Sequence, residues 1–211
     1  MDETERPGDK PWTNDRGYHA HIVKSLKAAG VVLNGNFALS KGSQSGYYVD
    51  LRKTLSNPFL RADIVIGLQA HARKLCPEVI AGVATSGIPW ATLVADRRHL
   101  PLVYVRPAEK EHGTGSQIEG IVKEGQRVLL IDDVLTTGES LSICADALRA
   151  KGAVIEDALV IVNRHDEFYD PELRNRVPVV GCQVLWLATL SELAGHAPGR
   201  AGELNTRLHH T

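Results

Sequence analysis

The chain has 211 residues, of which 43% are apolar and 23% are charged, an ordinary composition for a globular protein with one sizeable α/β core. Lysine and arginine total 24 against 25 acidic residues, so the sequence lacks the basic excess of a nucleic-acid-binding protein. No apolar run approaches a membrane span, and the first residues are too polar for a signal peptide. With three widely spaced cysteines, the chain is expected to be cytoplasmic, with reduced thiols and no membrane partner.

The first quarter of the sequence predicts a flexible arm and a small cap. Residues 1–16 are mostly polar and form the expected arm. Apolar residues recur at helical spacing over 17–29, and residues 35–52 alternate around a Gly/Ser turn, which is typical of a hairpin. Asn57-Pro58 is a helix start, with the helix expected to end near Leu75. We therefore expect a cap or hood over residues 17–56.

The rest of the chain predicts a central parallel sheet flanked by helices. Short apolar runs without a polar face are typical of strands that are buried on both sides. They occupy residues 79–83, 102–105, 128–131 and 158–162, with a further strand expected at 184–190. Helical stretches at 88–98 and 139–150 lie between them, which indicates right-handed crossovers. A polar tail at 194–211 completes what we expect to be a single α/β domain, residues 1–211.

The third apolar run leads directly into two acids and a Thr/Gly turn, Asp132-Asp133-Val134-Leu135-Thr136-Thr137-Gly138, before the helix at Glu139-Ser140. Functional sites of parallel sheets lie at the carboxyl ends of strands, and the first turn of a helix attracts anions. Carboxylates suit ribose hydroxyls, whereas backbone amides and hydroxyl groups suit a phosphate. Alternatively, Asp133 or Thr136 simply caps the helix, although that role leaves two acids after an apolar strand unexplained.

This segment, Val128 to Ser140, resembles the phosphoribosyl pyrophosphate signature of the type I phosphoribosyltransferases. The resemblance implies that fold, with Asp132 and Asp133 at the ribose hydroxyls, directly or through Mg²⁺. It also implies that residues 135–140 surround the 5-phosphate. Mg²⁺ would be bound mainly through the substrate, with the two aspartates as the candidate protein ligands.

Three further segments resemble the orotate branch of that superfamily. In the segment Phe37 to Arg52, Tyr47-Tyr48 supply aromatic rings that can stack on a pyrimidine, although alone they would only indicate a β-strand. Arg164 follows the strand at 158–162, and an arginine can pair with the orotate carboxylate through two hydrogen bonds. The resemblance thus implies that Tyr47, Tyr48, Thr136 and Arg164 bind orotate.

The third segment is the Gly-rich loop 106–118, which carries Arg106, Lys110 and His112. Alone it would be read as a solvated charged loop; the resemblance implies that it binds pyrophosphate and is shared between the subunits of a homodimer. Lys110 and His112 thus join the two aspartates as candidate catalytic residues. Thr85-Ser86 lie in the turn 83–89, whose backbone amides suit the same anion.

The resemblance covers roughly residues 37–164, but several lysines of the family pattern are absent. Arg106 is followed by Pro107-Ala108, Ser86 replaces a lysine of some members, and Lys41 is one position from where a lysine is expected. A shift of one residue in an extended segment turns a side chain to the opposite face.

The expected reaction converts orotate and phosphoribosyl pyrophosphate to orotidine 5′-monophosphate and pyrophosphate, a step of pyrimidine biosynthesis. The alternatives are a phosphoribosyltransferase for a purine or uracil, and a regulator that senses phosphoribosyl pyrophosphate and binds nucleic acid. The loop and the paired tyrosines favour orotate, whereas the charge balance disfavours the regulator.

Overall fold

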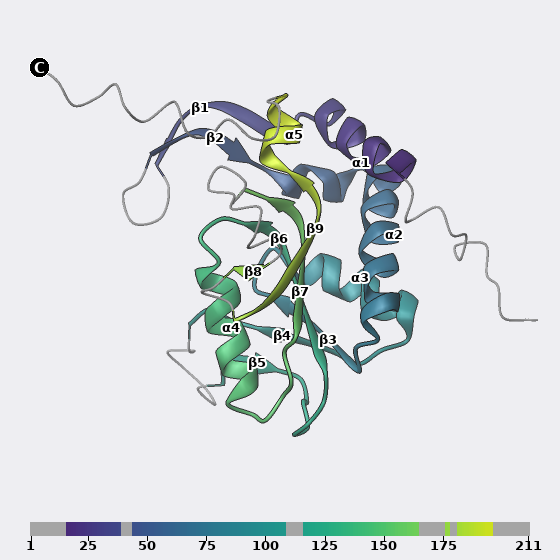
Figure 1. The fold of residues 1–211 in the computed structure, drawn as a ribbon, viewed down its shortest axis with the longest axis vertical. Helices are drawn as coiled ribbons and strands as arrows, with labels where there is room; N and C mark the ends of the chain where they lie inside the picture. Colours follow the sequence, from purple (N-terminus) through teal and green to yellow (C-terminus); the bar gives the residue numbers. More distant parts are fainter. Residues whose placement is uncertain (1–15, 39–43, 109–115, 165–175, 178–180, 196–211) are drawn as a thin grey trace, which may run out of the picture.

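The computed structural model describes residues 16–38, 44–108, 116–164, 176–177 and 181–195, arranged as a sheet between helices with a small hood at one end (Figure 1). The main sheet has seven strands in the order β5-β4-β3-β6-β7-β9-β8. Neighbouring strands from β4 to β9 are parallel, and the short edge strands β5 and β8 are antiparallel. The strands are β3 (Val79–Val83), β4 (Leu102–Val105), β5 (Ile118–Glu119), β6 (Val128–Leu135), β7 (Asp157–Asn163), β8 (Arg176–Val177) and β9 (Cys182–Thr189). The predicted parallel sheet is confirmed.

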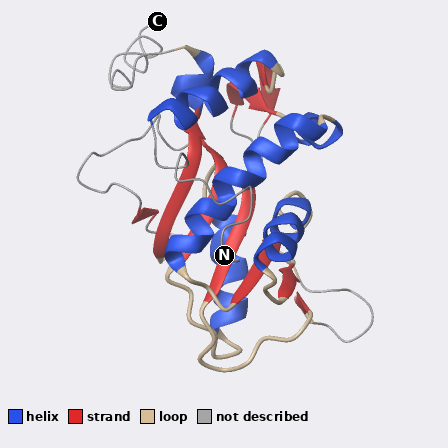
Figure 2. Cartoon of the chain, turned by 90° about the vertical axis from the view of Figure 1, so that its right-hand side faces the viewer, coloured by secondary structure: helices blue, strands red, loops and turns tan. Residues whose placement is uncertain are grey.

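Helices cover both faces of this sheet (Figure 2). Helices α2 (Pro58–Leu75) and α3 (Ile88–Arg98) pack on one face, and α4 (Glu139–Arg149) packs on the other. Each side has its own apolar core, and every residue of β3 is buried. This double burial explains why the central strands carry no polar face.

The helix boundaries follow local capping chemistry. The Asn57 side chain accepts hydrogen bonds from the backbone N–H groups of Phe59 and Leu60, each at 3.1 Å, and Pro58 begins α2 as predicted. The expected strand at 184–190 ends at Thr189, because the Thr189 and Glu192 side chains form a capping box that starts helix α5 (Leu190–Ala194). The sequence reading did not predict α5.

Strand β6 extends further than predicted. It was expected to end before Asp132 but runs on to Leu135, because its backbone stays paired with β7 from Asp132 opposite Val160 to Leu135 opposite Asn163. Both aspartates therefore lie within a strand, where neighbouring side chains point to opposite faces.

The hood contains helix α1 (Arg16–Ala28), the antiparallel strands β1 (Val32–Ala38) and β2 (Gln44–Val49), and the 3₁₀ helix η3 (Leu51–Ser56). The predicted hairpin is confirmed. Helix α1 begins at Arg16, at the end of the segment expected to be a flexible arm; residues 1–15 and 196–211 lie outside the described residues. Two side-chain hydrogen bonds join α1 to other helices, His19 with Glu192 of α5 at 2.7 Å and His21 with Asp63 of α2 at 2.9 Å.

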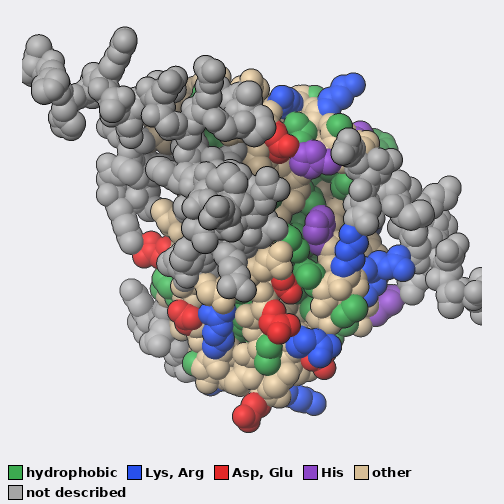
Figure 3. All heavy atoms as spheres, in the orientation of Figure 1, with side chains coloured by type: hydrophobic (Ala, Val, Ile, Leu, Met, Phe, Trp, Pro, Cys, Tyr) green, Lys and Arg blue, Asp and Glu red, His purple; other side chains and the backbone are tan. Residues whose placement is uncertain are grey.

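The surface carries mixed charge. Acidic and basic side chains are interspersed over the coloured part of the face in Figure 3, in agreement with the near-zero net charge. Among the described residues, no helix combines the length and the apolar character that crossing a membrane requires.

Helix α1 of the hood packs closely against Gly67 of α2. The buried Tyr18 hydroxyl lies over this glycine and donates a 2.6 Å hydrogen bond to the backbone oxygen of Asp63. Burial raises the pKa of Tyr18, so the hydroxyl keeps its proton. A Cβ at position 67 would collide with that hydroxyl and would lie 3.0 Å from the Leu187 side chain.

We expect Gly67→Ala to lower the free energy of unfolding by about 1–3 kcal/mol, because overpacking outweighs the better helix propensity of alanine. In a Tyr18→Phe background the same change should cost less, since the colliding oxygen is gone. Urea denaturation of the four proteins measures this coupling. Strictly additive effects would contradict the proposed contact.

Candidate active site

Two adjacent carboxylates lie near the carboxyl end of β6, in the middle of the sheet. Asp132 is only 7% exposed, and one of its oxygens accepts a 2.9 Å hydrogen bond from the backbone N–H of Asp133. Burial, and then the neighbouring charge of Asp133, raise the pKa of Asp132 well above its usual range. The Asp133 side chain is half-buried and accepts from the Val134 N–H at 2.8 Å. The predicted pair is therefore asymmetric, with Asp133 the more accessible acid.

The turn between β3 and α3 lies beside these acids. The Ser86 hydroxyl donates a 3.0 Å hydrogen bond to the same Asp133 oxygen that Val134 contacts, while Thr85 is exposed. A Cβ at Gly87 would collide with the Ile131 carbonyl oxygen, so glycine is required for this close approach. The structure thus brings the predicted pyrophosphate turn and the predicted ribose acids into direct contact.

The turn at 136–138 leads into α4 through Gly138, whose φ of 77° is in the left-handed region that glycine favours. No side chain caps the helix at this residue, and the contact between Thr137 Oγ1 and the Glu139 N–H is long, at 3.4 Å. Gly138, and neither Asp133 nor Thr136, occupies the N-cap position of α4. A helix N-terminus of this kind suits an anion. The Leu135 side chain is buried in the core, which leaves only its backbone for a ligand.

A short antiparallel stem supports the loop 106–118. Strand β5 was not predicted; it pairs with β4, and the Arg106 N–H donates to the Gln117 carbonyl at 2.9 Å. The Arg106 guanidinium pairs with Glu119 at 3.0 Å and lies 5.4 Å from the centre of the Tyr104 ring. Lys110 and His112 lie outside the described residues, so their predicted roles stay predictions.

Arg164 joins the end of β7 to the hood. It is 9% exposed, and its Nη2 donates to the Ser45 hydroxyl at 2.9 Å and to the Tyr47 carbonyl at 3.2 Å. Tyr47 packs against the hydrophobic core, whereas the next residue, Tyr48, has its hydroxyl at 2.9 Å from Arg52. The sheet therefore brings the predicted orotate residues to the same edge as the aspartates, with the two tyrosines on opposite faces of β2.

Three neighbours of the predicted residues were not singled out from the sequence: Arg52, Glu119 and Cys144. Burial raises the pKa of the Cys144 thiol to about 12, and the nearby Asp132 adds to this effect. Arg52 lies four residues after Tyr48, and this spacing alone is a weak signal for a contact. The 3₁₀ helix that brings the Arg52 side chain back to the Tyr48 hydroxyl was not predicted.

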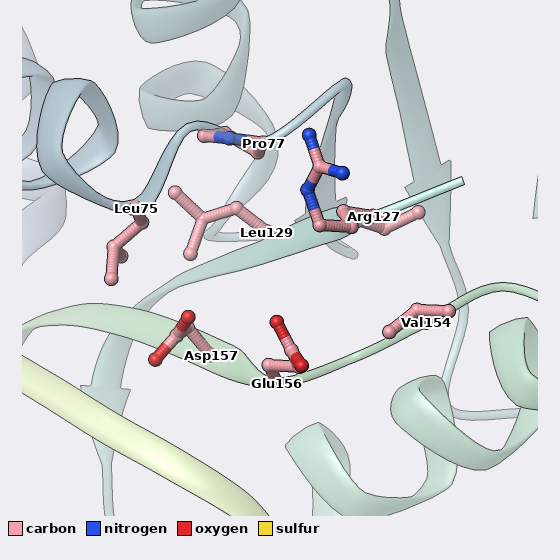
Figure 4. A pocket seen from close by; sticks show the side chains of 8 residues that line it. Leu75, Pro77, Arg127, Leu129, Val154, Glu156 and Asp157 are labelled. Carbon is pink, nitrogen blue, oxygen red and sulfur yellow. The ribbon is translucent and has the colours of Figure 1, made fainter. Parts of the chain in front are cut away.

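A small pocket lies at the other end of the strands, near the amino ends of β6 and β7 and away from these residues. Figure 4 shows the side chains that line it. Its walls combine apolar side chains with Arg127, Glu156 and Asp157 near the amino ends of β6 and β7. Sites in parallel sheets lie at the carboxyl ends of strands, so the aspartate edge is the better candidate.

Comparison with known proteins agrees with the family that the sequence motifs resemble. Residues 63–179 match the model of the phosphoribosyl transferase domain. Over 179 residues, the chain is 41% identical to an orotate phosphoribosyltransferase of Aeropyrum pernix, covering 82% of this chain and 93% of that protein.

Solved structures agree on the fold. The crystal structure of the Aeropyrum pernix orotate phosphoribosyltransferase matches with a TM-score of 0.69 at 32% identity, covering 82% of this chain and 97% of the other. An adenine phosphoribosyltransferase of Rhodothermus marinus matches with a TM-score of 0.62 at 19% identity, covering 81% and 99%. Enzymes for different bases therefore share this fold. The higher sequence identity to the orotate enzyme distinguishes the orotate family from the adenine family. On these grounds the chain belongs to the orotate phosphoribosyltransferase family.

Proposed function

We propose that the protein transfers the phosphoribosyl group of phosphoribosyl pyrophosphate to orotate. In this reaction the bond from ribose C1 to the pyrophosphate oxygen breaks, and a bond from C1 to a ring nitrogen of orotate forms. The nitrogen loses its proton, and pyrophosphate leaves. The main structural support is the contact between Ser86 and Asp133, which places a candidate pyrophosphate turn beside a candidate ribose site.

Each part of the donor has a matching protein group. The carboxylates of Asp132 and Asp133 suit the ribose hydroxyls, and the N-terminus of α4 with residues 135–140 suits the 5-phosphate. The turn at Thr85-Ser86 offers backbone amides to pyrophosphate. Arg106, Lys110 and His112 would stabilise the negative charge that the leaving group gains in the transition state.

The aspartate pair also fits Mg²⁺ bound with the substrate. Among the described residues no group of three or more metal-ligating side chains occurs, so a fully protein-bound ion is not supported there. Mg²⁺ commonly takes one or two carboxylates and completes its ligand shell with phosphate oxygens and water. When bound, the ion would neutralise pyrophosphate charge.

The groups that would select the base come from the carboxyl ends of β6 and β7 and from the hood. Arg164 can pair with the orotate carboxylate, and Thr136 lies in the turn that follows the aspartates. Because Tyr47 packs into the core, Tyr48 is the better placed of the two rings to stack on a pyrimidine.

We further propose a homodimer in which the loop 106–118 reaches the active site of the partner subunit. The base of this loop lies on the edge strand β5, next to the exposed side chain of Ile121, which is 79% exposed. We also propose a cytoplasmic location, which the three free cysteines support.

The expected acceptor is tested by following orotate absorbance with Mg²⁺ and phosphoribosyl pyrophosphate, in parallel with uracil, hypoxanthine and adenine. We expect turnover with orotate and at least about a hundredfold less with the bases that lack its carboxylate, since these bases offer no carboxylate oxygens to the Arg164 guanidinium. If only a different base is turned over, that base and not orotate is the substrate. No turnover, combined with binding of phosphoribosyl pyrophosphate and nucleic acid, would favour the regulator.

The burial of Asp132 leads to a second expectation. Asp132→Asn should raise the unfolding midpoint of the free protein, because it removes a costly buried carboxylate while its amide oxygen still accepts from the Asp133 N–H. The same variant should bind phosphoribosyl pyrophosphate at least about tenfold more weakly. Thermal unfolding and titration calorimetry measure the two effects, and a less stable variant would show that the charge is compensated in the free protein.

Mixing two inactive variants tests the shared loop. Lys110→Ala removes a group of the loop, and Asp133→Asn removes a group of the sheet. If the loop acts across the dimer, reassorted mixed dimers contain one intact site, and activity should return to about a quarter of wild type. Each variant reassorted with itself is the control. Mixed dimers that remain inactive would place the loop in its own subunit's site.

A further inference from the structure

Arg52 lies where the hood joins the core, in the first turn of η3. Its Nε donates to the Asp50 carboxylate at 3.0 Å, and its Nη2 donates to the Tyr48 hydroxyl at 2.9 Å. The two contacts use different nitrogens of one planar guanidinium, so the group is held at two points. Asp50 is the more buried member of the ion pair, at 17% side-chain exposure against 64% for Arg52. Asp50 thus anchors Arg52, and Arg52 in turn holds Tyr48.

The Tyr48 ring is held from a second side. Its centre lies 5.5 Å from that of Phe37 on the paired strand β1, with an angle of 36° between the ring planes. Arg52 contacts the hydroxyl end of the same ring. A tyrosine side chain has two main torsions, and two contacts of this kind restrict both of them. The ring therefore has a defined orientation before any ligand is present.

The strand that carries Tyr48 meets the candidate donor site through Arg164, whose guanidinium donates to the Tyr47 carbonyl at 3.2 Å and whose backbone N–H donates to the Leu135 carbonyl of β6 at 2.9 Å. The pKa of Arg52 is raised, chiefly by the hydrogen bond to Asp50, with a small contribution from Asp133. Asp133 is the more accessible of the two site aspartates. The Tyr48–Arg52 contact therefore lies at the boundary between the hood and the donor site, where the acceptor base would have to lie.

We propose that Arg52 is a positioning residue for the acceptor base, which acts by holding the Tyr48 ring in the orientation for stacking on a flat, anionic pyrimidine. The inference rests on the proposed function and deepens it. Arg52 acts through Tyr48 and not by direct contact with the donor. A preorganised ring saves the ordering cost that binding would otherwise carry, so the effect falls on acceptor affinity.

A double-mutant cycle tests this role with Arg52→Met, Tyr48→Phe and the combined variant. Each single variant should raise KM for orotate by about tenfold, because each removes the same charge-assisted hydrogen bond. The combined variant should be no worse than the poorer single variant, and KM for phosphoribosyl pyrophosphate should stay within about twofold of wild type. Arg52→Lys should lie between wild type and Arg52→Met, since one ammonium group cannot serve both partners.

Lys53→Met is the matched control. It removes the same charge from the next residue, which is also exposed on the same 3₁₀ helix, and should leave both KM values within about twofold of wild type. If Arg52→Met does not fold, Arg52→Lys with Tyr48→Phe provides the same cycle.

Three results would overturn the role of Arg52: an unchanged KM for orotate, an equal rise in both KM values, or fully additive effects in the combined variant. Absence of orotate turnover by the wild-type protein would instead contradict the proposed function. The two failures are therefore distinguishable.

Discussion

The burial of a carboxylate within β6 is the constraint on which the rest of the site depends. Asp132 is nearly inaccessible, and its usual hydration is replaced only in part by the backbone N–H of the next residue. Such a charge is tolerable where a ligand or its metal ion completes the interactions. The surrounding turns are organised around this position: Ser86 holds the neighbouring Asp133, and Gly87 allows the turn to approach the strand. A negative charge on Asp132 is therefore unfavourable in the free protein, and a cationic or hydroxylated ligand would reduce its cost.

Two arginines hold the hood in place through hydrogen bonds. Arg164 reaches from the sheet to the backbone of β2, and Arg52 reaches from η3 to a side chain of the same strand. Arg164 joins elements that are more than a hundred residues apart, whereas Arg52 joins two consecutive elements of the hood. Two histidine hydrogen bonds of α1 and the contact at Gly67 complete this attachment. The hood is thus fixed to the core by hydrogen bonds as well as by apolar packing.

Much of this organisation could be predicted from local sequence. The apolar runs without a polar face predicted the sheet, and Asn57-Pro58 predicted the start of α2, because these signals depend on neighbours within a few residues. The end of β6 was predicted wrongly because pairing with β7, a partner distant in sequence, decides it. The contacts of Ser86, Glu119 and Arg52 also could not be predicted, since each depends on how turns meet in space. The proposed roles of individual residues came from the resemblance to known phosphoribosyltransferases, because the spacing of apolar residues carries no information about ligand binding.

The alternation along β2 has a consequence for how such an enzyme can change. Tyr47 packs against the core and Tyr48 contacts Arg52, so adjacent positions serve core packing and, under the proposed function, ligand contact. A substitution at the second position alters what the hood offers to a ligand without opening a cavity in the core. Selection can therefore act on acceptor preference at one residue while the neighbouring residue preserves the scaffold. This separation exists because neighbouring side chains of a β-strand point to opposite faces.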